Sequence, residues 1–140
     1  MSTPEWWASV VGLSEVLAVE DRAEVARWRD GSGVDEDGDV PPLTVRLAHL
    51  GRALAEHVDA MTPQQRRLVL DLLERVLATG SEHDSTAVAT GFLEALVSAW
   101  DRGFDFPRIW DDLGPKSQEY CIAWNAFNRI DLPPWMRVSR

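Results

Sequence analysis

Apolar residues recur three and four positions apart through most of this chain, and that spacing predicts amphipathic α-helices. The clearest example is segment 85–100, whose apolar residues fall on one broad face: Val88, Ala89, Phe92, Leu93, Leu96, Val97 and Trp100. Gly91 lies within the same segment, although a glycine inside a helix costs about 1 kcal/mol relative to alanine. We therefore predict a central helix that another element approaches closely at Gly91.

The N-terminal segment is predicted to be helical as far as Asp30. A helix-start signal lies at Ser2 or Thr3, and the apolar residues fit either one long helix or two helices with a kink near 19–21. The next segment, 30–42 (DGSGVDEDGDVPP), predicts a loop because it contains three glycines, two prolines and five acidic residues.

Two further helices are predicted between this loop and the central helix. The first covers 43–59. The second begins after Thr62, where the sequence Thr-Pro-Gln-Gln matches a capping box, and ends at Gly80. Because about three residues join the two helices, we expect them to pack as an antiparallel hairpin.

After the central helix, the pattern predicts a short helix and a longer one. Pro107 can open the short helix, which would make about two turns, and Gly114 can close it. The longer helix covers 115–128, with these residues facing inward: Tyr120, Cys121, Trp124 and Phe127. The tail, 129–140, contains two adjacent prolines and is predicted to be non-helical, with Trp135 packing back onto the bundle.

The chain is therefore predicted to form one all-α domain over residues 1–140, a bundle of five to six helices. No segment alternates as a strand does, and 140 residues suffice for one hydrophobic core. No apolar run approaches the length of about 18 residues that a membrane span needs, and no signal-peptide pattern is present, so we expect a cytoplasmic protein. Cys121 is the single cysteine, which excludes an internal disulfide.

The formal net charge is -9, and acidic residues are concentrated near the N-terminus. Residues 1–40 carry ten acids against three arginines. This balance argues against nucleic acids and anionic membranes as partners, and it is compatible with a basic protein partner. An acidic surface also aids solubility, and that simpler explanation stays open.

No catalytic, metal-binding or nucleotide-binding motif stands out, so we predict a non-enzymatic protein without a cofactor. The acidic loop lacks the first and last ligands of an EF-hand calcium site. His49 and His57 are eight residues apart, too far for the i, i+4 pairing that chelates zinc, and His83 lies in a predicted turn. Cys121 falls on an apolar face, where a cysteine usually behaves as a small hydrophobic residue.

Seven tryptophans are the one anomaly of the composition. Most of them are expected in the core, where tryptophan fills space well in a small helical protein. Tryptophan is also common in binding pockets and interface hot spots. Four tryptophans lie near charged or proline-rich segments and are candidates for lining a groove: Trp6, Trp28, Trp110 and Trp135.

Two motifs carry a family resemblance: ATGFLEAL in the central helix and LGPKSQEYCIAWNAF in the last helix. They are similar to a family of small, uncharacterised helical bacterial proteins, some of which resemble immunity proteins of toxin–immunity systems. The resemblance covers 63–127, and its matching positions are mostly core residues and helix breaks. It implies a binding role, and the acidic charge fits an inhibitor that covers a basic toxin surface.

The leading hypothesis is therefore a protein-binding domain that acts as an immunity-type inhibitor of a basic toxin or effector. The predicted partner-binding residues lie in the first helix and its loop: Glu20, Asp21, Glu24, Trp28, Asp35, Glu36 and Asp37. The alternative is a small-molecule-binding protein or an enzyme with an aromatic pocket, lined by Phe92, Trp100, Trp110, Tyr120 and Trp124. A homodimer that buries Trp6 and Trp7 between subunits is a third possibility.

Overall fold

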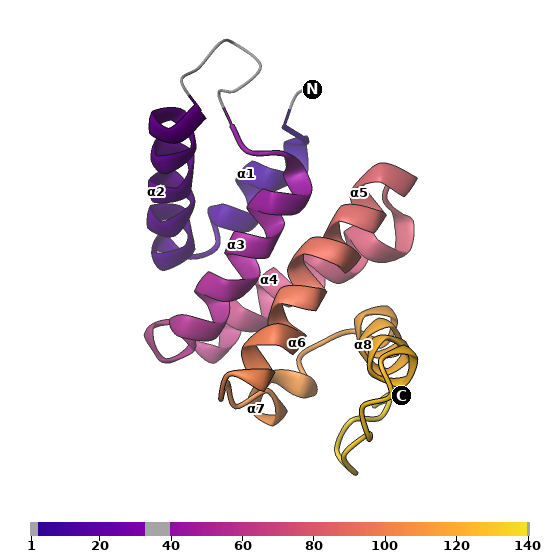
Figure 1. Cartoon of the computed structure of the whole chain (residues 1–140). Coiled ribbons are helices and arrows are strands. Elements are labelled where there is room, and N and C mark those ends of the chain that lie inside the picture. Colours follow the sequence, from indigo (N-terminus) through magenta and orange to yellow (C-terminus); the bar gives the residue numbers. More distant parts are fainter. Residues whose placement is uncertain (1–2, 33–39, 140) are drawn as a thin grey trace.

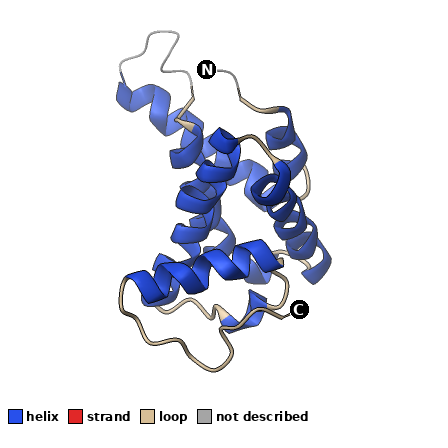
Figure 2. Ribbon diagram, turned by 90° about the vertical axis from the view of Figure 1, so that its right-hand side faces the viewer, coloured by secondary structure: helices blue, strands red, loops and turns tan. Residues whose placement is uncertain are grey.

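The all-α class is confirmed by the structure, a computed structural model that describes residues 3–32 and 40–139. Every regular element in these two ranges is a helix (Figures 1 and 2). In chain order they are α1 (Glu5–Val11), α2 (Glu15–Ser32), α3 (Leu43–Glu56), a 3-10 turn (Val58–Ala60), α4 (Pro63–Thr79), α5 (Glu82–Ala87), a π-helical segment (Val88–Leu93), α6 (Glu94–Asp101), α7 (Pro107–Trp110) and α8 (Pro115–Phe127). Within the described ranges, no helix combines the length and the apolar character needed to span a membrane.

α5, the π-helical segment and α6 follow one another without a break and form one central helix, 82–101. It crosses α3 at two glycines. A Cβ at Gly91 would lie 2.5 Å from the carbonyl oxygen of Thr44, and a Cβ at Gly51 would lie 2.8 Å from the carbonyl oxygen of Phe92. The close approach predicted at Gly91 is therefore confirmed, and α3 contributes a second glycine to the crossing.

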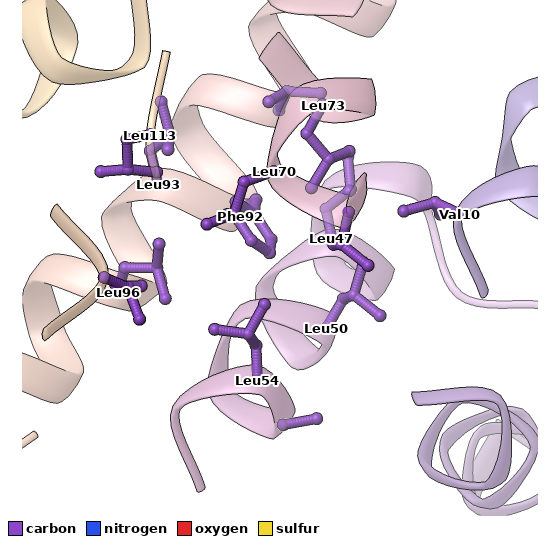
Figure 3. Close-up of a cluster of buried hydrophobic side chains, with 14 of the residues drawn as sticks. Val10, Leu47, Leu50, Leu54, Leu70, Leu73, Phe92, Leu93, Leu96 and Leu113 are labelled. Atoms are coloured by element: carbon purple, nitrogen blue, oxygen red, sulfur yellow. The ribbon is translucent and has the colours of Figure 1, made fainter. Parts of the chain in front are cut away.

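The core lies between α3, α4 and the central helix, with α1 closing one side (Figure 3). Leu47, Leu50 and Leu54 line the inner face of α3 and are at most 2% exposed. Full burial of one such side chain contributes about 1.5–3 kcal/mol to folding. The other buried side chains labelled in Figure 3 are Val10, Leu70, Leu73, Phe92, Leu93, Leu96 and Leu113.

The N-terminal segment folds as two helices, and the break lies at 12–14 instead of near 19–21. The hydroxyl of Ser14 accepts a hydrogen bond from the backbone N–H of Leu17 (3.3 Å), which caps the start of α2. The break between the two helices therefore lies at Gly12 and at the Ser14 cap. The spacing of the apolar residues did not indicate this position.

Both ends of this segment also differ from the prediction. Pro4 is the N-cap residue of α1 and makes no side-chain cap bond, so the predicted cap at Thr3 is wrong. The alternative cap, Ser2, lies outside the described residues. α2 continues to Ser32, so the first residues of the predicted loop 30–42 are helical.

α3 and α4 do not form the predicted antiparallel hairpin. α3 packs mainly against the central helix and α2, whereas α4 packs against α5 and α8. The start of α4 is as predicted: the Thr62 hydroxyl accepts from the N–H of Gln65 (3.1 Å), and the Gln65 side chain accepts from the N–H of Thr62 (2.9 Å). The central helix therefore covers the apolar face of α3 that a hairpin would have given to α4.

A carboxylate from α4 holds the N-terminus of α8. Glu74 accepts hydrogen bonds from the backbone N–H groups of Lys116 (2.8 Å) and Ser117 (2.9 Å). Its negative charge lies at the positive end of the helix dipole. A Cβ at Gly114 would lie 2.3 Å from Cγ of Glu74, so the residue that precedes α8 must be small for this contact to form.

The inner face of α8 differs from the prediction at its last residue. Phe127 is 87% exposed, because the buried face of this helix consists of Ser117, Gln118, Cys121 and Asn125. α7 makes a single turn instead of two. The tail is not helical, and the ring of Trp135 packs 5.4 Å from the ring of Trp100 and 5.6 Å from that of Trp110, as predicted.

Candidate functional site

A recess of about 480 Å³ lies where the starts of α1, α3 and α5 meet the C-terminal part of α2. The start of the described chain, the end of α2 and the start of α3 lie at the same end of the molecule (Figure 1). Pockets that bind small ligands or anchor side chains have volumes of about 300–1,000 Å³. The apolar wall of this recess consists of Pro4, Trp28, Val40, Pro41, Pro42 and Leu43.

Trp28 contributes ring carbon to the recess. Its Nε1 atom is buried and has no hydrogen-bond partner among the described residues. The part of the indole that remains accessible is therefore its carbon surface. Of the four tryptophans proposed to line a groove, this is the one that lines the recess.

Asp84, in the first turn of α5, is the acidic residue of the recess. Its Oδ2 atom accepts a hydrogen bond from Nε1 of Trp6 (2.9 Å), which fixes the carboxylate against α1. Asp84 is not the cap of this helix: Ser81 has that role, and its hydroxyl accepts from the N–H of Asp84 (3.1 Å).

Arg46, on α3, is the basic residue of the recess, and Asp21 of α2 neutralises it. Nε and Nη2 of Arg46 donate to the two carboxylate oxygens of Asp21 at 2.8 and 2.7 Å. Nε1 of Trp7 donates to the same carboxylate (3.2 Å), and the Arg46 guanidinium lies 4.8 Å from the centre of the Trp7 ring. Such a bidentate pair is stronger and more directional than a single contact.

The predicted partner-binding acids therefore occupy different environments. Asp21 is only 7% exposed and is bonded on both oxygens, so it is not part of the outer surface. Glu20 and Glu24 are half-buried and face α3. The remaining three acids, Asp35, Glu36 and Asp37, lie outside the described residues.

Glu20 and Glu24 meet His49 of α3 and His57, the residue that follows α3. Glu20 lies 3.5 Å from Nε2 of His49 and 3.4 Å from Nε2 of His57, and Glu24 lies 3.9 Å from Nδ1 of His49. In the described ranges, no group of three or more His, Cys, Asp and Glu side chains is arranged to hold a metal ion. These contacts join α2 to α3 and to the residue after it. The spacing of the histidines along the chain could not reveal them, because the partner carboxylates lie on another helix.

Several aromatic residues of the C-terminal half pack together around one buried ring. Phe106 is fully buried, and its ring lies between 5.5 and 6.2 Å from the rings of Trp100, Trp110 and Trp135. Trp100 and Trp110, two of the five residues considered for an aromatic pocket, therefore pack against other rings. The tail contributes to this packing, because its backbone carbonyl at Arg137 accepts from Nε1 of Trp110 (2.8 Å).

Two residues considered for a dimer contact are used within the chain. Trp7 is 3% exposed and bonds to Asp21, and half-buried Trp6 bonds to Asp84. Trp7 is therefore covered within the chain, whereas half-buried Trp6 keeps part of its surface accessible.

The reactive groups of α8 are held in their neutral forms. Burial raises the pKa of the Cys121 thiol to about 12, so the thiolate is scarce at neutral pH. Burial, followed by the hydrogen bond to Glu94, raises the pKa of Tyr120 above its ordinary value.

The family described as "Domain of unknown function (DUF7674)" matches residues 19–129, which is most of the chain. The chain belongs to this family. No curated protein and no solved structure matches the chain. The DUF7674 match includes Trp28, Arg46 and Asp84, whereas Thr3 and Pro4 of the recess precede it.

The sequence alone indicated Trp28 but not the other residues that line the recess. The sequence predicts Pro41 and Pro42 only as the end of a loop, whereas they lie directly before α3, with Pro42 as its N-cap residue, and line the recess. Two prolines before a helix, with a tryptophan in the preceding helix, are the signal that could have suggested an apolar recess. The arrangement of Arg46 and Asp84 depends on long-range packing, which apolar spacing does not indicate.

Proposed function

We propose that this DUF7674 protein binds another protein at the recess and acts without catalysis, as an immunity-type inhibitor of a basic toxin or effector. The recess carries this proposal, because it combines an apolar wall, a tryptophan and a charged residue in one concave surface. Buried aromatic anchors in such pockets dominate the energy of many protein interfaces. The immunity-type role and the bacterial origin rest on the two motifs that are similar to a family of small helical bacterial proteins, some of which resemble immunity proteins.

The charge of the molecule supports a basic partner. The net charge is -9, and the acids exceed the basic residues most strongly in residues 1–40. Two exposed acids flank recess residues in the chain: Glu5 follows Pro4, and Glu82 precedes His83. An acidic rim would accelerate the approach of a basic protein and would lose this effect as salt is added.

The test is affinity purification from the organism that encodes the chain, at low and at moderate salt. We expect one basic partner in stoichiometric amount, whose binding weakens with salt. Trp28→Ala should abolish capture, because it removes the aromatic wall of the recess. Phe127→Ala is the matched control, since it removes an exposed aromatic residue from α8, outside the recess.

Two results would contradict the proposal. If no partner is captured at either salt concentration, protein binding is not the function. If Trp28→Ala captures the partner as well as the unchanged protein does, the partner binds elsewhere. Circular dichroism of both variants would show that they are folded.

A small-molecule ligand in the same recess is the second candidate. The observation that favours it is the predominantly apolar wall, which suits a compact ligand as well as a side chain. Native mass spectrometry of the protein purified from its source would show this ligand as a defined added mass. Trp28→Ala should remove that mass, and the same mass on the variant would contradict this candidate.

A further inference from the structure

The chain already holds one arginine side chain between an indole and a carboxylate. The guanidinium of Arg46 lies over the ring of Trp7, 4.8 Å from its centre, and donates to both oxygens of Asp21. A guanidinium is flat and cationic, and its N–H donors lie in its plane. An aromatic ring can therefore stack on the face of the guanidinium through a cation–π contact, while a carboxylate accepts charge-assisted hydrogen bonds at its edge.

The recess brings together the same two groups, the indole of Trp28 and the carboxylate of Asp84. Trp28 offers ring carbon, since its Nε1 is buried. Asp84 uses Oδ2 to accept from Trp6, and no described residue bonds to its Oδ1. One aromatic surface and one available carboxylate oxygen thus line a single concave site.

The charge balance of the recess favours a cation. Arg46 is the other ionised residue of the wall, and the buried carboxylate of Asp21 neutralises it; the side chains of this pair are 11% and 9% exposed. With His83 counted as neutral, Asp84 carries the uncompensated charge among the lining residues. A long cationic side chain can place its methylene groups on the proline-rich wall while its head reaches this carboxylate.

We propose that the recess binds an arginine side chain of the protein partner, with the guanidinium stacked on Trp28 and hydrogen-bonded to Oδ1 of Asp84. This proposal rests on the proposed function, because it names the residue by which the basic partner is anchored. Arginine is expected in preference to lysine, since an ammonium group is compact, strongly hydrated and unable to stack on the indole.

The test is an NMR titration of the ¹⁵N-labelled protein with the peptide acetyl-Gly-Arg-Gly-amide. The indole Nε1 resonance of Trp28, identified by its loss in Trp28→Phe, should shift progressively as peptide is added. The same peptide with citrulline has nearly the same shape without the charge. It should bind about tenfold more weakly, because the charge-assisted hydrogen bonds are lost, and the lysine peptide should also bind more weakly.

Asp84→Asn is the decisive variant, because asparagine keeps an oxygen that can accept from Trp6 while the negative charge is removed. It should weaken binding of the arginine peptide about tenfold. Glu119→Gln removes an exposed charge from α8, outside the recess lining and its acidic rim, and should leave the affinity within about twofold.

Three results would overturn the proposal: equal binding of the arginine and citrulline peptides, equal binding of the arginine and lysine peptides, or unchanged binding to Asp84→Asn. These results are distinct from failure of the proposed function. If affinity purification yields a partner that Trp28→Ala loses and Asp84→Asn retains, the recess binds a protein but not through arginine. If no partner is captured at all, the proposed function itself fails.

Discussion

Gly91 and Gly51 allow two helix backbones to approach more closely than any side chain permits. Gly91 could be singled out from the sequence, because a glycine in the middle of an apolar helical face must have a reason to be there. Gly51 also lies on the apolar face of α3, between Leu47 and Leu54, but only the fold shows that it meets the carbonyl oxygen of Phe92. Partners such as Arg46 and Asp21 are likewise beyond prediction from spacing, since the fold brings together residues that are far apart in the chain.

The glycine contact gives a prediction for Gly91→Ala. The added methyl group would meet the backbone of α3, so the free energy of unfolding should fall by about 1–3 kcal/mol. Gly31→Ala is the control, because a Cβ at Gly31 meets no atom within 4 Å. That variant should be neutral or stabilised by up to about 1 kcal/mol. Urea denaturation measures both, and equal stability of the two variants would contradict the close packing at Gly91.

At the scale of elements, the helices themselves were easier to predict than their partners. The start of α4 followed from its capping box, because a cap depends on residues next to each other in sequence. The prediction that α3 and α4 form a hairpin was wrong. A short connection brings two helix ends together, but it does not decide which apolar faces pack against each other. The π-helical segment Val88–Leu93 was also not indicated, because its residues continue an ordinary helical pattern.

The attachment of α8 to α4 gives a prediction at this scale. Glu74→Ala removes the acceptor of three donors: the N–H groups of Lys116 and Ser117 and the hydroxyl of Ser117. The free energy of unfolding should fall by about 1.5–3 kcal/mol, and amide exchange should become faster in the first turn of α8.

Glu119→Ala is the control for this attachment. Glu119 is exposed on the same helix and pairs with Lys116 at 4.0 Å, a contact of small energetic value. Its removal should change the stability by less than about 0.5 kcal/mol. If both variants lose the same amount of unfolding free energy, Glu74 does not hold the N-terminus of α8 in the way described.

At the scale of the whole molecule, one buried core joins the helices, as the length and composition predicted. The class and single core were predictable because they depend on the sum of many apolar positions. The recess was not, because it lies where the ends of four helices meet. Trp28 was found only as one of four candidates, and its place in the same recess as Asp84 depends on how α2 and α5 are arranged.

Cys121 reports on the integrity of this core. It is fully buried, and its raised pKa of about 12 keeps it as the thiol at pH 8. Ellman's reagent at pH 8 should therefore not react with the folded protein. As urea is added, the reactive fraction should follow the loss of helical circular dichroism. Reaction of the native protein at the rate of a free cysteine would show that α8 opens separately from the core.

The contact between Glu74 and Gly114 also constrains how this chain can diverge. Any side chain at position 114 would collide with Glu74, whereas shortening residue 74 removes the obstacle at the cost of the α8 attachment. The two positions therefore depend on each other: a larger residue at 114 requires the Glu74 side chain to move away from the first turn of α8 or to be replaced. Among DUF7674 relatives, a larger residue at the position of Gly114 should be found only in lineages that hold the last helix in another way.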